Sequence, residues 1–219
     1  MKTFTIGYMM VLLMSIQQGT RAQSPILATE LNRPYSAHEM VITAGYGEMT
    51  HEIMEFLGSP TEPIDVKMAV INRLGRPLME EQDRVRAFFN YLKSSAGYRN
   101  RNEFMKRGKD HELLCLAYLT AINYPHKSPD AIEMAEMAVT KNQTASFTFR
   151  IICSLIKAEG LYHEFQWCSV YHIVAEVNND TSLFRDMPED AVRAIFLEID
   201  TYHEHCLHPD ERGRVRKRQ

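Results

Sequence analysis

The sequence has 219 residues, of which 45% are hydrophobic and 24% are charged, which is enough for one domain with a sizeable hydrophobic core. Its 25 basic and 28 acidic residues give a formal net charge of −3. Contacts to nucleic-acid phosphates need clustered lysine and arginine, so this acidic balance argues against DNA or RNA as a partner.

Residues 1–22 have the layout of a cleavable secretory signal. Lys2 is followed by an uncharged stretch, residues 4–16, and then by a short polar segment that ends at Ala22. A stretch this short does not cross a bilayer, which needs about 20 apolar residues, and no later segment is long and apolar enough either. We therefore expect the chain from Gln23 onward to be exported, as a secreted or periplasmic protein without a stable membrane anchor.

Composition divides the rest of the chain into an arm, a helical domain and a tail. Residues 23–36 are polar with two prolines and are predicted to form an extended arm. Residues 37–206 carry the helical patterns, and residues 207–219 form a basic tail that is predicted to be flexible. Periodicity and stop signals predict a helix over residues 37–57 that is broken near residues 45–47, and a second helix from Pro63 to Gly75. A third helix is predicted over residues 80–94 and is ended by Gly97. Residues 100–109 are predicted to form only a short turn.

Residues 110–143 are predicted to be a helical hairpin at the centre of the fold. Every residue from 113 to 119 is hydrophobic, so a helix through them has no polar face and must be covered on several sides. Asp110 is expected to cap its start, and Pro125 ends it near residue 123 or 124. The second helix starts with Ser128 and Pro129. Its predicted inward stripe is Ile132, Ala135, Met137 and Val139, with Ala131 and Ala138 between them.

The order of small residues in this hairpin resembles a tetratricopeptide repeat. Leu116 and Ala117 lie in the first helix, Ala131 and Ala138 lie in the second, and a turn follows at Asn142. The resemblance covers about 34 residues, the period of that repeat. When the hairpin sequence is aligned with the chain 38 residues later, residues 147–178 match it more weakly as a second unit. The resemblance implies an array of antiparallel helical hairpins, and an irregular helical bundle is the alternative.

The remaining sequence predicts three further helices. The first begins at Thr144 or Ser146 and ends before Gly160, and the others cover residues 162–177 and 188–203. Almost no stretch alternates with period two, as a half-buried strand would. The predicted class is therefore all-α, with about eight helices.

Four cysteines lie in the part of the chain expected to enter an oxidising compartment, so disulfides are plausible. If the turn between two helices centres on residues 160–161, Cys153 and Cys168 lie at equal distances from it, and we favour this pair. If the repeat is real, Cys115 and Cys153 occupy equivalent positions on stacked helices and could pair instead. Cys115 can also be simply a small buried hydrophobic residue.

The densest cluster of metal-binding side chains is near the C-terminal end of the predicted domain. His205, Cys206 and His208 carry imidazole and thiol groups, which are good ligands for zinc or copper, and the end of a helix could present them together. The spacing of one or two residues is only a weak signal, because it lacks a partner motif elsewhere. The dipeptide His-Glu occurs five times but never extends to the H-E-x-x-H spacing of a zinc protease.

Catalytic motifs are missing from the sequence. It contains neither a G-x-S-x-G nucleophile turn nor a glycine-rich phosphate loop. Glu159 and Glu164 flank a predicted turn and could in principle form the carboxylate pair of a glycoside hydrolase. Two glutamates at a helix turn are far more often solvated, so an enzyme is the less favoured reading, and no cofactor is expected.

The sequence therefore favours an exported, non-enzymatic module that binds a protein or peptide in a groove between helix layers. Candidate groove residues are Tyr118, Asn123 and Tyr162, which the helix packing does not require. The alternative is a small secreted metal-binding protein or hydrolase on the same helical scaffold.

Overall fold

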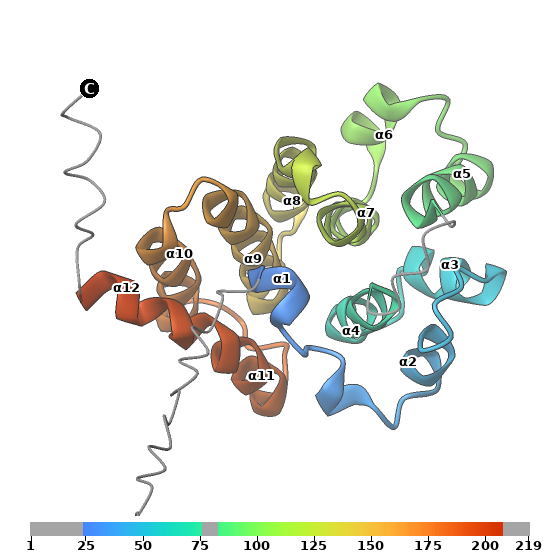
Figure 1. Ribbon diagram of the computed structural model, residues 1–219. Coiled ribbons are helices and arrows are strands. Elements are labelled where there is room, and N and C mark those ends of the chain that lie inside the picture. Colours follow the sequence, from blue (N-terminus) through green and yellow to red (C-terminus); the bar gives the residue numbers. More distant parts are fainter. Residues whose placement is uncertain (1–23, 76–82, 208–219) are drawn as a thin grey trace, which may run out of the picture.

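A computed structural model describes residues 24–75 and 83–207, and in these ranges the protein is all-α, as predicted, without a β-strand (Figure 1). The predicted signal, residues 1–22, and all of the predicted tail except Leu207 lie outside the described residues. No helix in the described part of the chain is long and apolar enough to cross a membrane.

The first half of the chain forms short helices that begin and end near the predicted signals. The predicted break near residues 45–47 separates α2 from α3, and Gly97 ends α5 in a left-handed conformation with φ 74°. The stretch after Gly97 contains a helix rather than only a turn. The elements are α1 (Pro25–Ala28), η1 (Arg33–Tyr35), α2 (Glu39–Ala44), α3 (His51–Gly58), α4 (Ile64–Leu74), α5 (Arg84–Ala96) and α6 (Arg101–Arg107).

Helix α7 (Asp110–Asn123) is buried on all sides, which confirms the prediction from its hydrophobic sequence. Every residue from His111 to Ile122 is buried. The helix contacts α3, α4 and α5 from the first half of the chain, and α8 (Ser128–Lys141) and α9 (Phe147–His163) from the second (Figure 1). It therefore joins the two halves of the chain into one core.

Helix α8 packs against α7 through its small residues. The fully buried positions of α8 are spaced as one helical face, namely Ala131, Met134, Ala135 and Ala138. Ile132, Met137 and Val139, which were predicted to face inward, are only partly buried at the edges of this face. The prediction is confirmed for the three alanines and wrong for the three larger residues, because the alanines let the two helices approach closely and the larger side chains lie beside this contact.

Helix α9 passes through Gly160 instead of stopping there. It ends at His163, and the chain reverses over residues 164–166 before α10 (Trp167–Asn179). A glycine inside a helix costs about 1 kcal/mol relative to alanine, and the packing of α9 against α8, α10 and α7 outweighs this cost. In the reversal Phe165 has φ 60°, and the backbone N–H of Gln166 donates to the carbonyl of Leu161 at 2.9 Å.

The predicted disulfide between Cys153 and Cys168 is wrong, because Cys168 bonds to Cys206 with a Cα–Cα distance of 4.8 Å. The true turn lies about five residues later than expected, so Cys153 is roughly 15 Å along α9 from the end of that helix, while Cys168 is in the first turn of α10. Cys115 and Cys153 are both free and buried, so they do not pair either. Burial raises the pKa of the Cys115 thiol to about 12 and that of Cys153 to about 11.

The segment predicted to be an extended arm instead packs as short helices against the domain. Ile26 and Leu31 are fully buried, and α1 contacts α7, α9 and α11. The Ser24 hydroxyl donates to the Glu159 carboxylate at 2.6 Å, and the Ile26 backbone N–H donates to it at 3.3 Å. The sequence did not show this docking, because the partner of these two donors is 133 to 135 residues away.

The described chain ends in α11 (Glu189–Ile199), η3 (Asp200–His203) and α12 (Glu204–Leu207). Both η3 and α12 lie against α10, and α11 lies against η1 near the start of the described chain. The disulfide ties α12 to the first turn of α10 and closes this end of the molecule.

We predict that Cys206→Ser lowers the free energy of unfolding by about 3–4 kcal/mol in non-reducing buffer. The disulfide closes a loop across a sequence separation of 38 residues and so removes conformational entropy from the unfolded chain. Urea unfolding measures the change, and the unmodified protein in dithiothreitol should match the variant. A non-reducing peptide map that links Cys153 to another cysteine would contradict the assignment.

Candidate functional site

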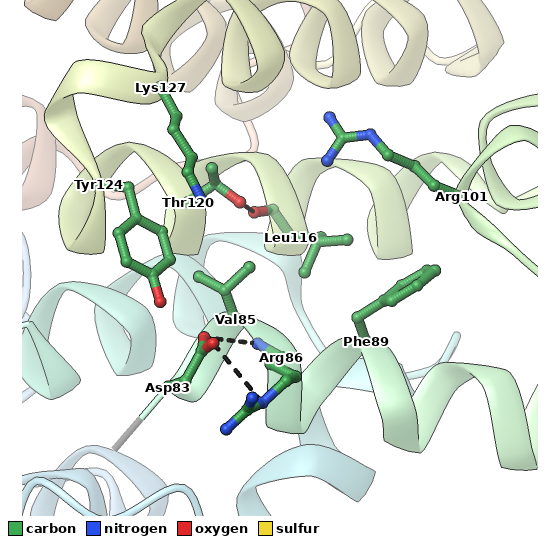
Figure 2. Close-up of a pocket in the computed structure, with 9 residues that line it drawn as sticks. All are labelled: Asp83, Val85, Arg86, Phe89, Arg101, Leu116, Thr120, Tyr124 and Lys127. Carbon is green, nitrogen blue, oxygen red and sulfur yellow. Dashed lines mark hydrogen bonds and ion pairs between the residues drawn. The ribbon is translucent and has the colours of Figure 1, made fainter. Parts of the chain in front are cut away.

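A cavity of about 220 Å³ lies where α5 crosses α7 in the described part of the chain (Figure 2). Its apolar floor consists of Val85 and Phe89 from α5 and Leu116 from α7. Helix α5 is amphipathic, so it turns Phe88 and Leu92 into the core while Val85 and Phe89 remain partly buried at the cavity. On α7 the lining residues Leu116 and Thr120 are four residues apart and share one face, and Tyr124, the residue that follows the helix, completes this wall.

The rim of the cavity is mostly cationic. Arg86 comes from α5, Arg101 from the start of α6, and Lys127 from the end of η2 (Pro125–Lys127), and the only acidic lining residue is Asp83 (Figure 2). The Arg86 side chain is 75% exposed and lies 3.6 Å from Asp83, so it can also reach a ligand. Arg101 also pairs with Asp130 at 3.6 Å, so three cations stand against the carboxylates of Asp83 and Asp130. The rim therefore keeps a positive local charge on a chain that is acidic as a whole.

Three interactions hold the rim in place. The Lys127 ammonium lies 4.3 Å from the centre of the Tyr124 ring, in cation–π geometry. The Asp83 carboxylate caps α5 by accepting from the backbone N–H of Arg86 at 2.9 Å, and it also accepts from the Tyr124 hydroxyl. Burial alone would raise the pKa of Asp83, but these hydrogen bonds and the charges of Arg86 and Lys127 outweigh it and lower the pKa. Burial and the bond to Asp83 raise the pKa of Tyr124.

The cavity can hold a ligand, but its described lining residues offer no reactive group. The Thr120 hydroxyl donates to the carbonyl of Leu116 at 2.7 Å, and the Tyr124 hydroxyl is engaged with Asp83. An activated nucleophile needs an adjacent base, and the lining residues of the described structure contain no such pair. The arrangement suits a carboxylate or another anion attached to an apolar group.

The binding residues expected from the sequence do not form one surface. Tyr118 is fully buried, and its hydroxyl accepts from the Asn72 side chain at 3.3 Å. Asn123 accepts from Arg84 at 3.3 Å and donates to the carbonyl of Leu119 at 2.8 Å. Tyr162 lies near the C-terminal end of α9 and packs edge-on against Tyr202.

The sequence did not predict the cationic rim, because Arg86, Arg101 and Lys127 lie in separate segments of the chain. A usable signal was nevertheless present in the sequence, since Leu116 and Thr120 lie four residues apart on one face of α7 and Tyr124 follows four residues later, just after the helix. This four-residue spacing identifies the side of the predicted helix that forms the wall of the cavity.

The expected metal ligands are only partly brought together. Cys206 is in the disulfide, the His205 ring packs on Trp167 with centroids 4.5 Å apart, and His208 lies outside the described residues. The side chain that approaches Cys206 is instead His172 of α10, four residues after Cys168. Sequence spacing could not reveal this cluster, because Cys206 joins it from a different helix.

The two carboxylates considered for hydrolase chemistry have different environments. Glu159 is 1% exposed and binds Ser24, the Ile26 backbone and, at 3.1 Å, the His163 ring. Glu164 is exposed and accepts from Gln166 at 2.8 Å. Glu159 thus anchors the N-terminal segment.

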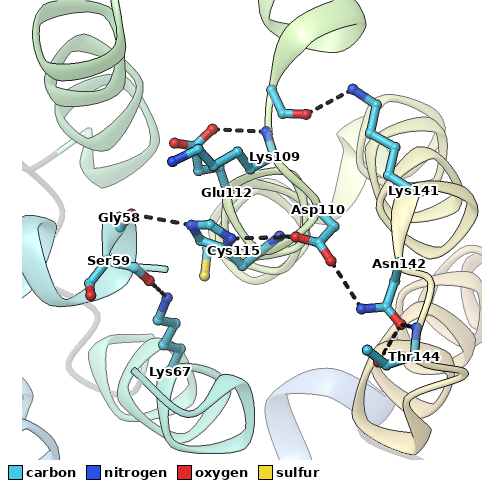
Figure 3. Close-up of polar contacts among 12 residues, drawn as sticks. Gly58, Ser59, Lys67, Lys109, Asp110, Glu112, Cys115, Lys141, Asn142 and Thr144 are labelled. Carbon is cyan, nitrogen blue, oxygen red and sulfur yellow. Dashed lines mark hydrogen bonds and ion pairs between the residues drawn. The ribbon is translucent and has the colours of Figure 1, made fainter. Parts of the chain in front are cut away.

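A second polar cluster lies at the start of α7 and contains cysteine, histidine and aspartate (Figure 3). The His111 ring contacts the Asp110 carboxylate at 3.4 Å and the carbonyl of Gly58 at 3.2 Å. Cys115 follows four residues after His111, but its thiol is fully buried, donates to the carbonyl of Leu57 and has a pKa raised to about 12 by burial. The thiol is therefore protonated and inaccessible, and Cys115 has a structural role here.

The same cluster ties neighbouring helices to α7. The buried ammonium of Lys67 donates to the carbonyl of Ser59, and burial lowers its pKa. Lys141, at the end of α8, donates to the carbonyl of Gly108 at 2.8 Å, and the Asn142 side chain donates to Asp110 at 3.0 Å (Figure 3). Asp110 is the first residue of α7 rather than the expected cap before it, and Glu112 instead accepts from the Lys109 backbone at 2.9 Å.

Comparisons of the chain with protein-family models, curated protein sequences and solved structures found no match.

We predict that Asp110→Asn lowers the free energy of unfolding by about 1–2 kcal/mol at pH 6. The side-chain bond to His111, followed by the bonds from Asn142 and the His111 backbone, overcomes desolvation and lowers the pKa of Asp110 from 3.8 to about 2. A lowered carboxyl pKa stabilises the folded state above about pH 4, and this stabilisation is lost as the pH falls toward 2. The Asp110 side chain is 31% exposed, so solvent screening reduces the effect.

Urea unfolding between pH 2 and pH 6 measures the effect of Asp110→Asn. The matched control is Asp190→Asn, in the first turn of α11, whose side chain is 75% exposed and should have little effect. A difference between wild type and Asp110→Asn that stays constant down to pH 2 would contradict the assignment.

Proposed function

We propose that this protein is an exported, non-enzymatic interaction module that binds a peptide segment carrying a carboxylate beside an apolar side chain. The segment would lie over the cavity between α5 and α7. The observation that carries the proposal is the convergence of Arg86, Arg101 and Lys127 on the rim above an apolar floor. Arginine suits this role because its planar guanidinium binds a carboxylate through two parallel hydrogen bonds.

The size of the cavity favours a side chain over a whole cofactor. Small-molecule sites usually occupy about 300–1,000 Å³, and this cavity holds about 220 Å³. A leucine-like side chain on Val85, Phe89 and Leu116 removes apolar surface from water, at about 25 cal/mol per Å². The adjacent carboxylate would then face the arginines at the rim.

The packing of the helices is consistent with a tetratricopeptide-like array as the scaffold. Helix α7 packs on α8, α8 on α9, and α9 on α10, in chain order. The pair α7 and α8 covers residues 110–141, and the pair α9 and α10 covers residues 147–179, close to the two units expected from the sequence. Stacked helical pairs commonly present extended peptide-binding surfaces.

Binding of fluorescein-labelled probe peptides tests the proposal by fluorescence anisotropy. The probe alternates leucine and glutamate over six residues, and the matched peptide has glutamine in place of glutamate. We expect the glutamate peptide to bind at least about tenfold more tightly at low salt, and raising the salt to narrow this difference. Equal affinity for both peptides would remove the electrostatic basis of the proposal.

Substitutions locate the binding site. The double variant Arg86→Glu with Arg101→Glu should weaken binding of the glutamate peptide by about tenfold or more, because it reverses two rim charges. The control is Arg33→Glu with Arg193→Glu, which makes the same charge change at exposed positions, 77% and 65% accessible, outside the cavity. If the control pair weakens binding as much as the rim pair, the peptide responds to net charge and not to this site.

A further inference from the structure

Three metal-ligating side chains converge at the C-terminal end of the described chain. Cys168 and His172 are four residues apart on one face of α10, and Cys206 reaches them from α12, which packs beside α10. One ligand atom from each residue, two sulfurs and one imidazole nitrogen, lies within 4.8 Å of the others. His172 is exposed and both cysteines are half-buried, so the cluster is open to solvent on one side.

We propose that this cluster is a redox-gated zinc site. Reduction of the disulfide by a dithiol breaks the bond between Cys168 and Cys206, leaving two protein thiols, while the reductant becomes a disulfide. Zn²⁺ then binds the two sulfurs with release of two protons, and the neutral imidazole of His172 supplies the third ligand. The fourth position is open to water, as in zinc sites with three protein ligands.

The geometry requires only a small rearrangement of side chains. In a tetrahedral site with Zn–S near 2.3 Å and Zn–N near 2.0–2.1 Å, two sulfurs lie roughly 3.8 Å apart and sulfur and nitrogen roughly 3.5 Å apart. The three ligand atoms here already lie within 4.8 Å of each other, which is close to these separations. Rotation of the two cysteine side chains accomplishes the rearrangement while α10 and α12 stay in place.

The donor set selects zinc and excludes the harder cations. Two thiolates and an imidazole are ligands for zinc, whereas calcium and magnesium prefer oxygen ligands. The disulfide form lacks thiolate charge, so the covalent bond and the metal exclude each other. The oxidation state of one cysteine pair thus decides whether the site exists.

The neighbouring histidines are occupied by packing. The His203 ring lies 4.6 Å from the Tyr171 ring, and the His205 ring lies 4.5 Å from the Trp167 ring. The His172 ring also packs against Tyr171, with centroids 5.5 Å apart, but a nitrogen of this ring lies within 4.8 Å of both sulfurs. His172 is therefore the ligand, and His205, although adjacent to Cys206, provides a matched control. The cluster shares no residue with the cavity at α5 and α7, so this proposal and the proposed peptide binding can fail independently.

The test uses the full chain in both redox states. One sample is reduced with dithiothreitol and desalted without oxygen, the other stays oxidised, and each is titrated with Co²⁺ as a spectroscopic substitute for zinc. The reduced protein should bind one Co²⁺ per chain, with a thiolate charge-transfer band that Zn²⁺ abolishes, and the oxidised protein should show neither. Binding to both forms, or to neither, overturns the proposal.

Variants identify the third ligand. His172→Ala should weaken Co²⁺ binding to the reduced protein by about tenfold or more, His172→Cys should restore it with a stronger charge-transfer band, and His205→Ala should leave it unchanged. Far-UV circular dichroism follows the helices throughout. The proposal is overturned if His172→Ala binds like wild type, if His205→Ala has the larger effect, or if the reduced chain unfolds and Zn²⁺ does not restore it.

Discussion

The burial of α7 on every side is the constraint on which the rest of the structure depends. A helix without a polar face is stable in water only when neighbours cover it completely, and its own sequence cannot supply them. Helices α3, α4 and α5 cover it from one half of the chain, and α8 and α9 cover it from the other. The polar groups at its start then fix its position, because Glu112, Asp110 and His111 bind the backbone or side chains of the flanking segments.

The candidate site follows from this arrangement. Helix α5 covers α7 with a face set by Phe88 and Leu92, so its next face, with Val85 and Phe89, meets α7 only at the edge. Polar and charged residues gather there because helix ends and short connections meet at the same place: the start of α5, the start of α6 and the η2 turn. The cavity is thus a consequence of how α7 is covered, and its positive charge is a property of the segments that meet over it.

Sequence patterns predicted the features that depend on local physics. The hydrophobic run of α7 and the glycine stop at Gly97 appear in the structure. Of the two predicted starts of α9, Thr144 and Ser146, the structure uses Ser146, whose side chain accepts from the Phe149 backbone. The errors concern interactions between distant segments. Gly160 is a good local stop signal that the packing of α9 overrides, and the disulfide prediction failed with it because the turn moved. The rim and the cysteine and histidine cluster each combine residues from separate segments, which periodicity within one helix cannot bring together.

The two candidate sites, the cavity and the cysteine and histidine cluster, are built on different helices, so each can respond to a ligand separately. The cavity wall belongs to α7, so its shape is as stable as the core itself, and only the exposed rim side chains can adjust to a ligand. The cluster instead joins α10 to the four-residue helix α12, whose contacts are with α10 and η3. Coupling between sites requires an element with two arrangements that both sites bias. The cavity is lined from α5, α6, α7, η2 and the residues beside them, and the cluster lies on α10 and α12, so the two sites share no element and a change in the cysteine pair acts directly on the C-terminal end alone.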